Sequence, residues 1–247
     1  MTLISVIIPA RDDAEFLRAC LAALALQTRQ ADEIVVVDNA SSDETAQVAR
    51  QAGARVVFEP LWGTPAAAAA GFDAAGGDVL ARLDADSLPP PDWLERVEAH
   101  LDGTDIPTLV TGPGRFYGSG RVTCWLGTHV YIRGYFWSMG VLLGHPPAFG
   151  SNFAMHAAVW AGVRARVHRA VRKVHDDLDL SIQLEPGVAI RFDDALLVGI
   201  SARPFDTIGG LSRRLWWAYL TLRRNNNEEP LRRRRRRWRA QVEGSHA

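Results

Sequence analysis

The sequence has only two cysteines, Cys20 and Cys124, and they lie far apart. So few cysteines provide no disulfide framework and fit a reducing compartment, where Cys20 is expected to act as a small buried hydrophobe. Long apolar runs are also missing, and no stretch reaches the 18 apolar residues that a membrane-spanning helix needs. Residues 3–9 are too short for a signal peptide and lack a basic leader. We therefore expect a cytoplasmic protein.

The chain has no overall excess of positive or negative charge, since its formal net charge is +0. The charge is nevertheless uneven, since arginines crowd the C-terminal end and leave the body before them acidic. These arginines are Arg213, Arg214, Arg223, Arg224, Arg232 to Arg237 and Arg239. The length suits one large α/β domain or two small ones, with ample material for a core.

Roughly the first hundred residues alternate between short apolar runs and amphipathic stretches. The runs are rich in β-branched residues, as buried parallel strands are. We predict four strands, at residues 3–9, 33–38, 55–58 and 78–83. Capping patterns predict the starts of the intervening helices, at Asp12 with Glu15, Ser41 with Glu44, and Thr64 with Pro65. This order predicts an α/β fold, with an open, mostly parallel sheet and helices on both faces.

Ligands of such sheets bind beyond the carboxyl ends of the strands. The residues predicted there are Pro9, Arg11, Asp38, Asp84 and Asp86. Asp84 and Asp86 are one residue apart and can converge on one hard cation, which prefers oxygen ligands. The alternative is a solvated turn, in which aspartate is common. A dinucleotide-binding dehydrogenase is disfavoured, because no G-x-G-x-x-G follows the first strand.

Three motifs at these strand ends together resemble a known family. They are Val-Ile-Ile-Pro-Ala-Arg at 6–11, Val-Asp-Asn-Ala-Ser-Ser-Asp at 37–43 and Leu-Asp-Ala-Asp at 83–86. The pattern resembles the nucleotide-binding half of family 2 glycosyltransferases of the GT-A fold. This resemblance implies that Pro9, Arg11, Glu15 and Asp38 hold the nucleobase of a donor. It also implies that Asp84 meets the ribose and that Asp86, with Asp84, holds Mn²⁺ or Mg²⁺.

Two later motifs extend the resemblance. Residues 150–155 resemble a small-residue turn beside the donor sugar, which implies a donor contact for Asn152. Residues 174–181 resemble an acid-rich motif that supplies the catalytic base of inverting members, with Asp177 ahead of Asp176. An ordinary acidic helix N-terminus is the competing interpretation. Residues 201–204 resemble the family's basic Ser-x-Arg-Arg turn, which is expected near the donor phosphates. Pro204 stands at the second arginine position, so the resemblance implies a phosphate contact for Arg203 alone.

Further strands are expected at residues 109–112, 187–192 and 196–198, and a helix from Pro91. The aromatic segment 125–149 fits a second core, an acceptor platform or a surface against lipid. Residues 211–224 predict a basic amphipathic helix typical of a membrane surface. The block Arg232 to Arg237 is expected to be disordered or bound to anions. Anionic lipid is the favoured partner, a simply solvated tail is the close alternative, and nucleic acid is disfavoured.

We thus divide the chain into a nucleotide-sugar-binding half (1–100), an acceptor-binding and catalytic half of the same domain (101–206), and a basic, partly disordered tail (207–247). The expected function is metal-dependent, inverting transfer of a sugar from a UDP- or GDP-type donor to a hydroxyl of a glycan or glycolipid. Two alternatives stay open: a polyprenyl-phosphate glycosyl synthase, and a non-catalytic nucleotide-sugar-binding protein at the membrane. The expected location is cytoplasmic, with peripheral association at the inner face of the membrane as a further hypothesis.

Overall fold

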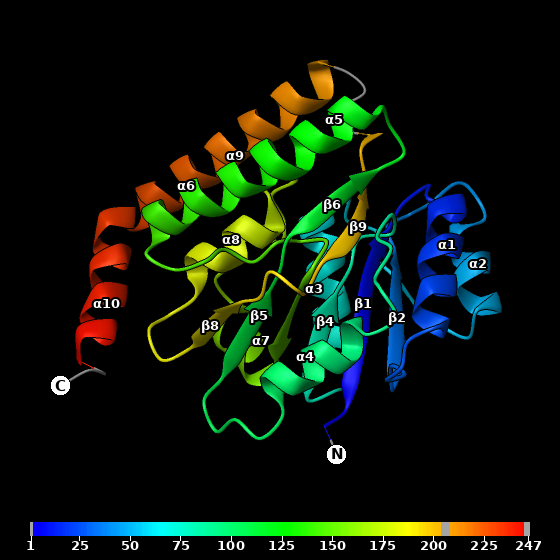
Figure 1. Cartoon of the computed structure of the whole chain (residues 1–247), viewed down its shortest axis with the longest axis horizontal. Coiled ribbons are helices and arrows are strands. Elements are labelled where there is room, and N and C mark those ends of the chain that lie inside the picture. Colours follow the sequence, from blue (N-terminus) through cyan, green and yellow to red (C-terminus); the bar gives the residue numbers. More distant parts are fainter. Residues whose placement is uncertain (1, 204–207, 245–247) are drawn as a thin grey trace.

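The computed structural model describes residues 2–203 and 208–244. Its centre is a seven-stranded sheet in the order β3-β2-β1-β4-β7-β5-β8, beside a two-stranded sheet of β6 and β9 (Figure 1). The strands are β1 Ile4–Ala10, β2 Glu33–Asp38, β3 Arg55–Phe58, β4 Val79–Arg82, β5 Thr108–Thr111, β6 Gly114–Tyr117, β7 Phe153–His156, β8 Ala189–Phe192 and β9 Val198–Ser201. β7 runs antiparallel to β4 and β5, and the remaining pairs are parallel. The predicted α/β architecture is confirmed.

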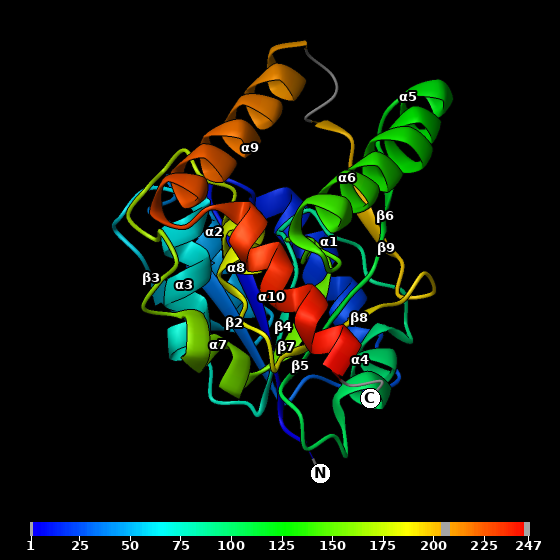
Figure 2. The same ribbon diagram turned by 90° about the vertical axis from the view of Figure 1, so that its left-hand side faces the viewer.

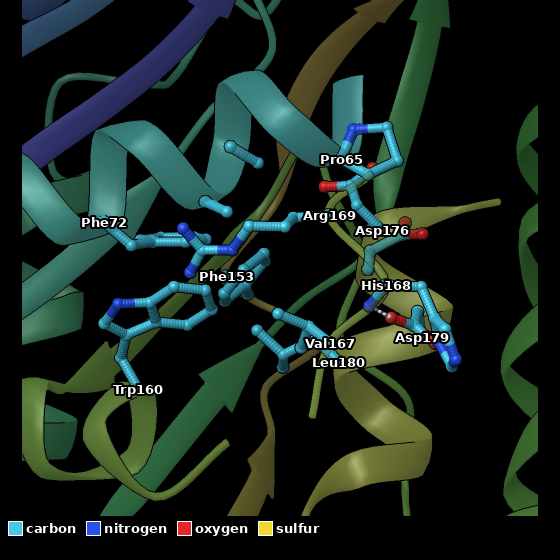
Figure 3. A pocket seen from close by; sticks show the side chains of 13 residues that line it. Pro65, Phe72, Phe153, Trp160, Val167, His168, Arg169, Asp176, Asp179 and Leu180 are labelled. Carbon is cyan, nitrogen blue, oxygen red and sulfur yellow. Dashed lines mark hydrogen bonds and ion pairs between the residues drawn. The ribbon is translucent and has the colours of Figure 1, made fainter. Parts of the chain in front are cut away.

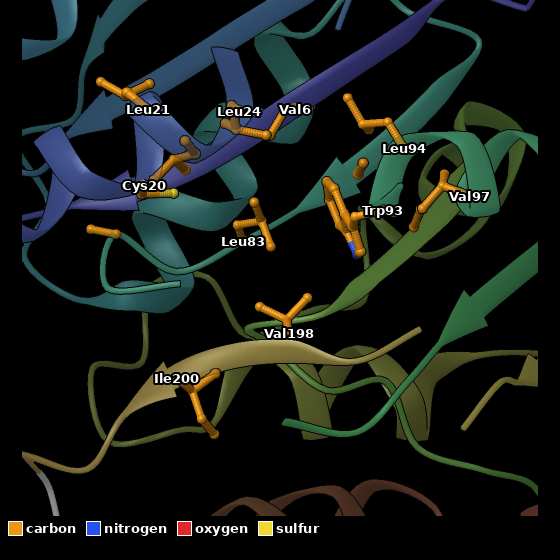
Figure 4. Packing of buried hydrophobic residues seen from close by; sticks show 14 of the residues in the cluster. Val6, Cys20, Leu21, Leu24, Leu83, Trp93, Leu94, Val97, Val198 and Ile200 are labelled. Atoms are coloured by element: carbon orange, nitrogen blue, oxygen red, sulfur yellow. The ribbon is translucent and has the colours of Figure 1, made fainter. Parts of the chain in front are cut away.

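Helices cover both faces of the large sheet. They are α1 Ala14–Ala25, α2 Thr45–Gln51, α3 Thr64–Ala74, α4 Trp93–Leu101, α5 Arg121–Leu126, η1 Gly127–Ile132, α6 Arg133–Leu143, α7 Ala157–Val163, α8 Asp176–Gln183, α9 Ile208–Glu228 and α10 Leu231–Gly244. Side chains alternate across a strand, so Val6 of β1 joins the core under α1, α2 and α4, while Ile7 joins the core under α3, α7 and α8. Figure 4 shows the first of these cores, in which Val6 lies near Leu24 of α1.

The four predicted N-terminal strands are confirmed, but two of the predicted helix caps are wrong. Helix α1 begins at Ala14 with Asp13 at its N-cap, and α2 begins at Thr45 with Glu44 at its N-cap. Asp12, at φ +50°, instead accepts hydrogen bonds from the backbone N (2.7 Å) and hydroxyl (2.9 Å) of Ser42. The start of α3 at Thr64, with proline in its first turn, agrees with the prediction.

The aromatic segment divides between core and surface. Tyr135 and Phe136 pack edge-to-face with ring centroids 5.4 Å apart, and Phe136 also contacts Phe192 of β8. Trp125 and Trp137 are 57% and 73% exposed. α5, η1 and α6 follow one another without a break and form a long arm that diverges from α9, as Figure 2 shows.

The C-terminal arginine block is not disordered, contrary to the prediction, because its residues form helix α10. Arg234 is buried and donates to the carbonyl of Ile182 at 2.8 Å, at the end of α8. Trp238 is also buried and lies 4.4 Å from the His145 ring, measured between ring centroids. Contacts with distant segments thus stabilise a stretch too highly charged to fold alone. Among the described residues, no helix is both long and apolar enough to cross a membrane.

Candidate active site

One buried guanidinium joins two motifs that are far apart in the sequence. Arg82, the last residue of β4, is only 1% exposed. Its Nη2 donates to Asp84 Oδ1 at 2.9 Å, and its Nη1 donates to Asp176 Oδ2 at the start of α8. A charge in so dry a place needs close counter-charges. Arg82 therefore holds the D-x-D loop and the acid-rich helix start together.

The turn that precedes β7 closes the same cluster. The Ser151 hydroxyl donates to Asp84 Oδ2 at 2.6 Å, and the Gly150 backbone N donates to Asp177 Oδ2 at 2.8 Å. A Cβ on Gly150 would lie 3.1 Å from Asp177 Oδ2 and 3.3 Å from Arg82 Nη1. Glycine at position 150 is what allows the turn to approach the carboxylates this closely.

Asp86 lies beside the second cation of the site. Arg203 Nη2 donates to Asp86 Oδ2 at 3.2 Å and Nη1 donates to Asp13 Oδ1 at 3.0 Å, while its guanidinium stacks 3.7 Å above the Phe16 ring. Burial, and then the nearby Asp84 carboxylate, raise the pKa of Asp86 to about 6, although Arg203 opposes the rise. A divalent cation at Asp86 would favour its ionised form.

The two acids at the start of α8 have different surroundings. Burial is the main cause that raises the pKa of Asp176 to about 6; Asp177 and Asp84 add to the rise, and Arg82 opposes it. Asp177 instead accepts backbone N–H bonds, from Gly150 to Oδ2 and from Leu178 to Oδ1 at 2.7 Å. The predicted helix start is confirmed, and it presents both carboxylates to the cluster.

The predicted nucleobase end lies where β1 and β2 finish. Pro9 is buried within β1. Asp38 is buried at the end of β2, where its Oδ1 accepts a hydrogen bond from the Ser41 backbone N at 3.0 Å. Arg11 stacks on Trp62, with the guanidinium carbon 3.3 Å from the ring centroid. Glu15 is exposed in the first turn of α1.

Asn152 differs from its sequence-based interpretation. It is fully buried; its Oδ1 accepts from Trp93 Nε1 at 2.9 Å, and its Nδ2 donates to the carbonyls of Pro113 and Leu196. The amide is thus used inside the fold and shapes the turn. Its neighbour Ser151 provides the side-chain contact to the cluster.

Sequence reasoning missed Arg82, Ser151 and Trp62. The signal for Arg82 was present, because a lone arginine in a buried strand must find carboxylates. Ser151 and Trp62 lie in loops, and their partners Asp84 and Arg11 could not be read from spacing.

A small recess lies between the acid-rich helix α8 and the helices α3 and α7, lined by Phe72, Trp160 and His168 as well as Asp176 (Figure 3). Its volume is about 20 Å³, which holds one water and no nucleotide. Asp84 and Asp86 do not line this recess. Within residues 2–203 and 208–244, no cluster of three or more histidine, cysteine, aspartate or glutamate side chains could by itself hold a metal.

The mostly parallel sheet with helices on both faces is the architecture of the GT-A fold. A family model described as glycosyl transferase family 2 matches residues 5–171, so the chain belongs to that family.

Solved structures share the fold. Glucosyl-3-phosphoglycerate synthase of Mycobacterium tuberculosis, crystallised with Mn²⁺, UDP and glucosyl-3-phosphoglycerate, aligns at TM-score 0.55 and 24% identity over 86% of this chain and 76% of its own. Mannosyl-3-phosphoglycerate synthase from Rubrobacter xylanophilus aligns at TM-score 0.60 and 19% identity over 92% of this chain and 75% of its own.

Curated relatives match a shorter part of the chain at higher identity. The glycosyltransferase AglE of Haloferax volcanii is 36% identical over 121 residues, covering 46% of this chain and 40% of that protein. An undecaprenyl-phosphate 4-deoxy-4-formamido-L-arabinose transferase of Aeromonas hydrophila is 34% identical over 115 residues, covering 42% of this chain and 35% of that protein. The matched segment thus spans less than half the length of these relatives.

Proposed function

We propose that the chain transfers a sugar, with inversion, from a nucleotide-sugar donor to an acceptor hydroxyl. The observation that carries the proposal is the cluster of Asp84, Asp176 and Asp177 assembled around Arg82, beside Asp86 and Arg203. These residues come from three separate segments and meet at the carboxyl edge of the sheet, where ligands of α/β sheets bind.

The donor would lie along this edge with its base toward β2. Arg11 and Trp62 offer a flat cationic and aromatic surface there, and Asp38 and Glu15 offer acceptors for base or ribose donors. Arg203 is placed to exchange its contact with Asp86 for a diphosphate oxygen, since guanidinium groups bind phosphate well.

The donor set at Asp86 and Asp84 fits Mn²⁺ or Mg²⁺, because such ions are commonly held by one or two carboxylates together with substrate phosphates. Support also comes from the M. tuberculosis neighbour, which was crystallised with Mn²⁺. When bound, the ion would neutralise charge on the nucleoside diphosphate leaving group.

Asp177 is proposed as the general base. It would take the proton of the acceptor hydroxyl while that oxygen attacks the anomeric carbon from the side opposite the leaving group. The N–H bonds from Gly150 and Leu178 fix the carboxylate and leave it lone pairs for this proton. Asp176, held by Arg82, would orient the helix start.

A polyprenyl phosphate is the second candidate acceptor. The names of several relatives, such as the A. hydrophila transferase, include undecaprenyl phosphate. Such an acceptor is already ionised and needs no base, so transfer to it would continue without the Asp177 carboxylate.

We also propose that the chain works at the cytoplasmic face of a membrane. Helix α9 supports this, because Leu215, Trp216 and Tyr219 are large apolar or aromatic side chains with about half of their surface exposed. Amphipathic helices at a bilayer surface have this composition.

The test uses the purified 247-residue chain with UDP- and GDP-sugars, Mn²⁺, and glycan or polyprenyl-phosphate acceptors. Asp177→Asn should keep donor binding and lower kcat by about 10²–10⁴-fold with a hydroxyl acceptor. Asp86→Ala should abolish transfer and the metal dependence of nucleotide affinity. Asp105→Asn, at an exposed carboxylate outside the cluster, is the matched control. Full activity of Asp177→Asn together with loss in Asp176→Asn would assign the base to Asp176.

A further inference from the structure

A hollow of about 520 Å³ lies between α9 and the segment 171–174, which leads into α8. Three cations line it: Lys173 from the segment, and Arg223 and Arg224 from α9. Val174 and Leu220 contribute apolar surface, and Asn227 contributes an amide. None of these residues belongs to the carboxylate cluster around Arg82.

The three cations have no counter-charge of their own. Across residues 2–203 and 208–244, no hydrogen bond or ion pair engages the side chain of Lys173, Arg223 or Arg224. Nearby arginines behave differently: Arg166 pairs with Glu185 at 2.8 Å, and Arg169 pairs with Asp73 at 2.8 Å. Arg166 and Arg169 are thus neutralised by carboxylates, whereas the cations of the hollow are available to a ligand.

Glu228 is the one carboxylate in the lining, and its side chain is paired with His168. The His168 Nε2 lies 2.7 Å from Glu228 Oε1, while its Nδ1 lies 2.7 Å from Asp179 Oδ1. Hydrogen bonding to Asp179 is the largest cause that raises the pKa of His168, and Glu228 adds to it. With three cations and one carboxylate in its lining, the hollow is positive.

We propose that this hollow binds the phosphate of an anionic phospholipid headgroup and so seats α9 on the membrane. The inference deepens, and rests on, the proposal that the chain works at a membrane surface. Two guanidinium groups and an ammonium around an apolar floor suit a phosphate that carries an acyl chain.

The rest of α9 favours a lipid over a soluble phosphate. Trp216 and Tyr219 stack with ring centroids 5.3 Å apart, and both are about half exposed. Arg223 follows Trp216 by seven residues, or about 10.5 Å along the helix. Aromatic side chains and arginines at this separation match the interface and headgroup levels of a bilayer.

A second exposed apolar face lies at the same end of the molecule. Figure 2 shows the first turns of α5 and α9 as the tips of two diverging arms. Val122, Trp125 and Leu126 of α5 are 72%, 57% and 48% exposed. Both tips can therefore meet one flat surface while the hollow lies further along α9.

The α10 arginines are less suited to this role than the sequence suggested. Arg234 is buried against Ile182, and Arg237 pairs with Glu229 at 2.9 Å. Arg232 and Arg236 stay exposed on α10 and provide a matched control, because they carry the same charge as Arg223 and Arg224.

Flotation with vesicles tests the proposal on the whole 247-residue chain. The probe is phosphatidylcholine vesicles with and without phosphatidylglycerol. Wild type should bind only the anionic vesicles, and Arg223→Gln/Arg224→Gln should lower the partition coefficient at least about tenfold. Lys173→Gln, on the other side of the hollow, should weaken binding independently. The control Arg232→Gln/Arg236→Gln should change it less than about threefold.

Equal losses in the two double variants would show that charge alone attracts the chain, and this would overturn the hollow as a site. Glycerol 1-phosphate could raise the melting temperature of wild type but not of Arg223→Gln/Arg224→Gln. If wild type then failed to bind vesicles, the hollow would bind a soluble phosphate, and the lipid would be overturned as its ligand. Asp177→Asn should bind vesicles like wild type, and the α9 double variant should keep metal-dependent donor hydrolysis measured without vesicles. Failure of this site is therefore distinguishable from failure of the proposed transfer reaction.

Discussion

Replacing Arg82 with methionine tests the centre of the candidate active site. Methionine keeps an unbranched side chain in the buried position but removes the guanidinium that bridges Asp84 and Asp176. The two carboxylates would then face each other without a cation, and Asp176 would stay largely buried, at 16% exposure. Such a site can relax only by protonating an acid or by admitting water.

The expected loss is large because one partner of a buried ion pair is removed while the others remain. Changes of this kind typically cost about 3–5 kcal/mol in the free energy of unfolding. The loss should depend on pH. Asp176 already has a pKa of about 6 against an ordinary 3.8, with Arg82 opposing the rise, so removal of Arg82 raises the pKa further. A folded-state pKa above the unfolded value stabilises the fold only at low pH, and that stabilisation disappears as the pH rises through the folded pKa.

Urea denaturation followed by circular dichroism at pH 5 and pH 8 measures both effects. Arg82→Met should lose more stability at pH 8 than at pH 5. Adding Asp176→Asn should recover part of the loss, since residues in one charge network couple by about 0.5–3 kcal/mol. A deficit below about 1 kcal/mol at pH 8, or one that is equal at both pH values, would refute the idea that Arg82 compensates buried carboxylates.

Three further changes test other parts of the fold. His168→Gln should flatten the pH dependence of the free energy of unfolding near neutrality. The raised pKa of His168 stabilises the fold below its ordinary pKa of 6.5, and this stabilisation is lost as the pH rises through the pKa of the folded state. An unchanged pH profile would contradict this. Gly71→Ala should destabilise by about 1–3 kcal/mol, since its Cβ would lie 2.4 Å from Ile7 Cγ2, whereas Gly162→Ala, with open space around it, should be neutral or slightly stabilising in the same denaturation assay. Trp238→Ala should cost about 3–5 kcal/mol if α10 is packed as part of the core, and no change in the urea midpoint would contradict that packing.

The N-terminal strands could be predicted from sequence because their signals are local. Runs such as residues 33–38 are apolar, β-branched and short, and the D-x-D acids follow directly from the fourth strand. The family resemblance added the order of the site residues. These two sources together placed Asp84, Asp86 and Asp177 at the edge that the structure assigns to them.

The helix caps failed for a reason that no local pattern contains. The loops after β1 and β2 exchange their capping groups. Asp12 accepts a hydrogen bond from the Ser42 backbone N at 2.7 Å, and Asp43 accepts one from the Ala14 backbone N at 3.1 Å. Asp12 thus serves the neighbouring loop, and Asp43 serves both the neighbouring loop and the Thr45 backbone N–H of its own helix, at 2.9 Å. The exchange fixes the two loops beside the proposed nucleobase site to each other, which a capping box within one helix could not do.

The tail was misread for the same physical reason, and its packing bears on catalysis. Asn225 of α9 donates to Asp179 Oδ1 at 2.8 Å and accepts from Gln183 Nε2 at 2.7 Å, so it binds two residues of α8 from one position. The first turn of α8 carries Asp177. All three polar side chains are buried. Displacement of α9 would remove the Asn225 acceptor from Gln183 Nε2 and would leave Asp179 with only its bonds from His168. A force on α9 at a membrane surface would therefore act on the helix that carries the proposed base, and the tail is better regarded as part of the catalytic domain than as an appendage to it.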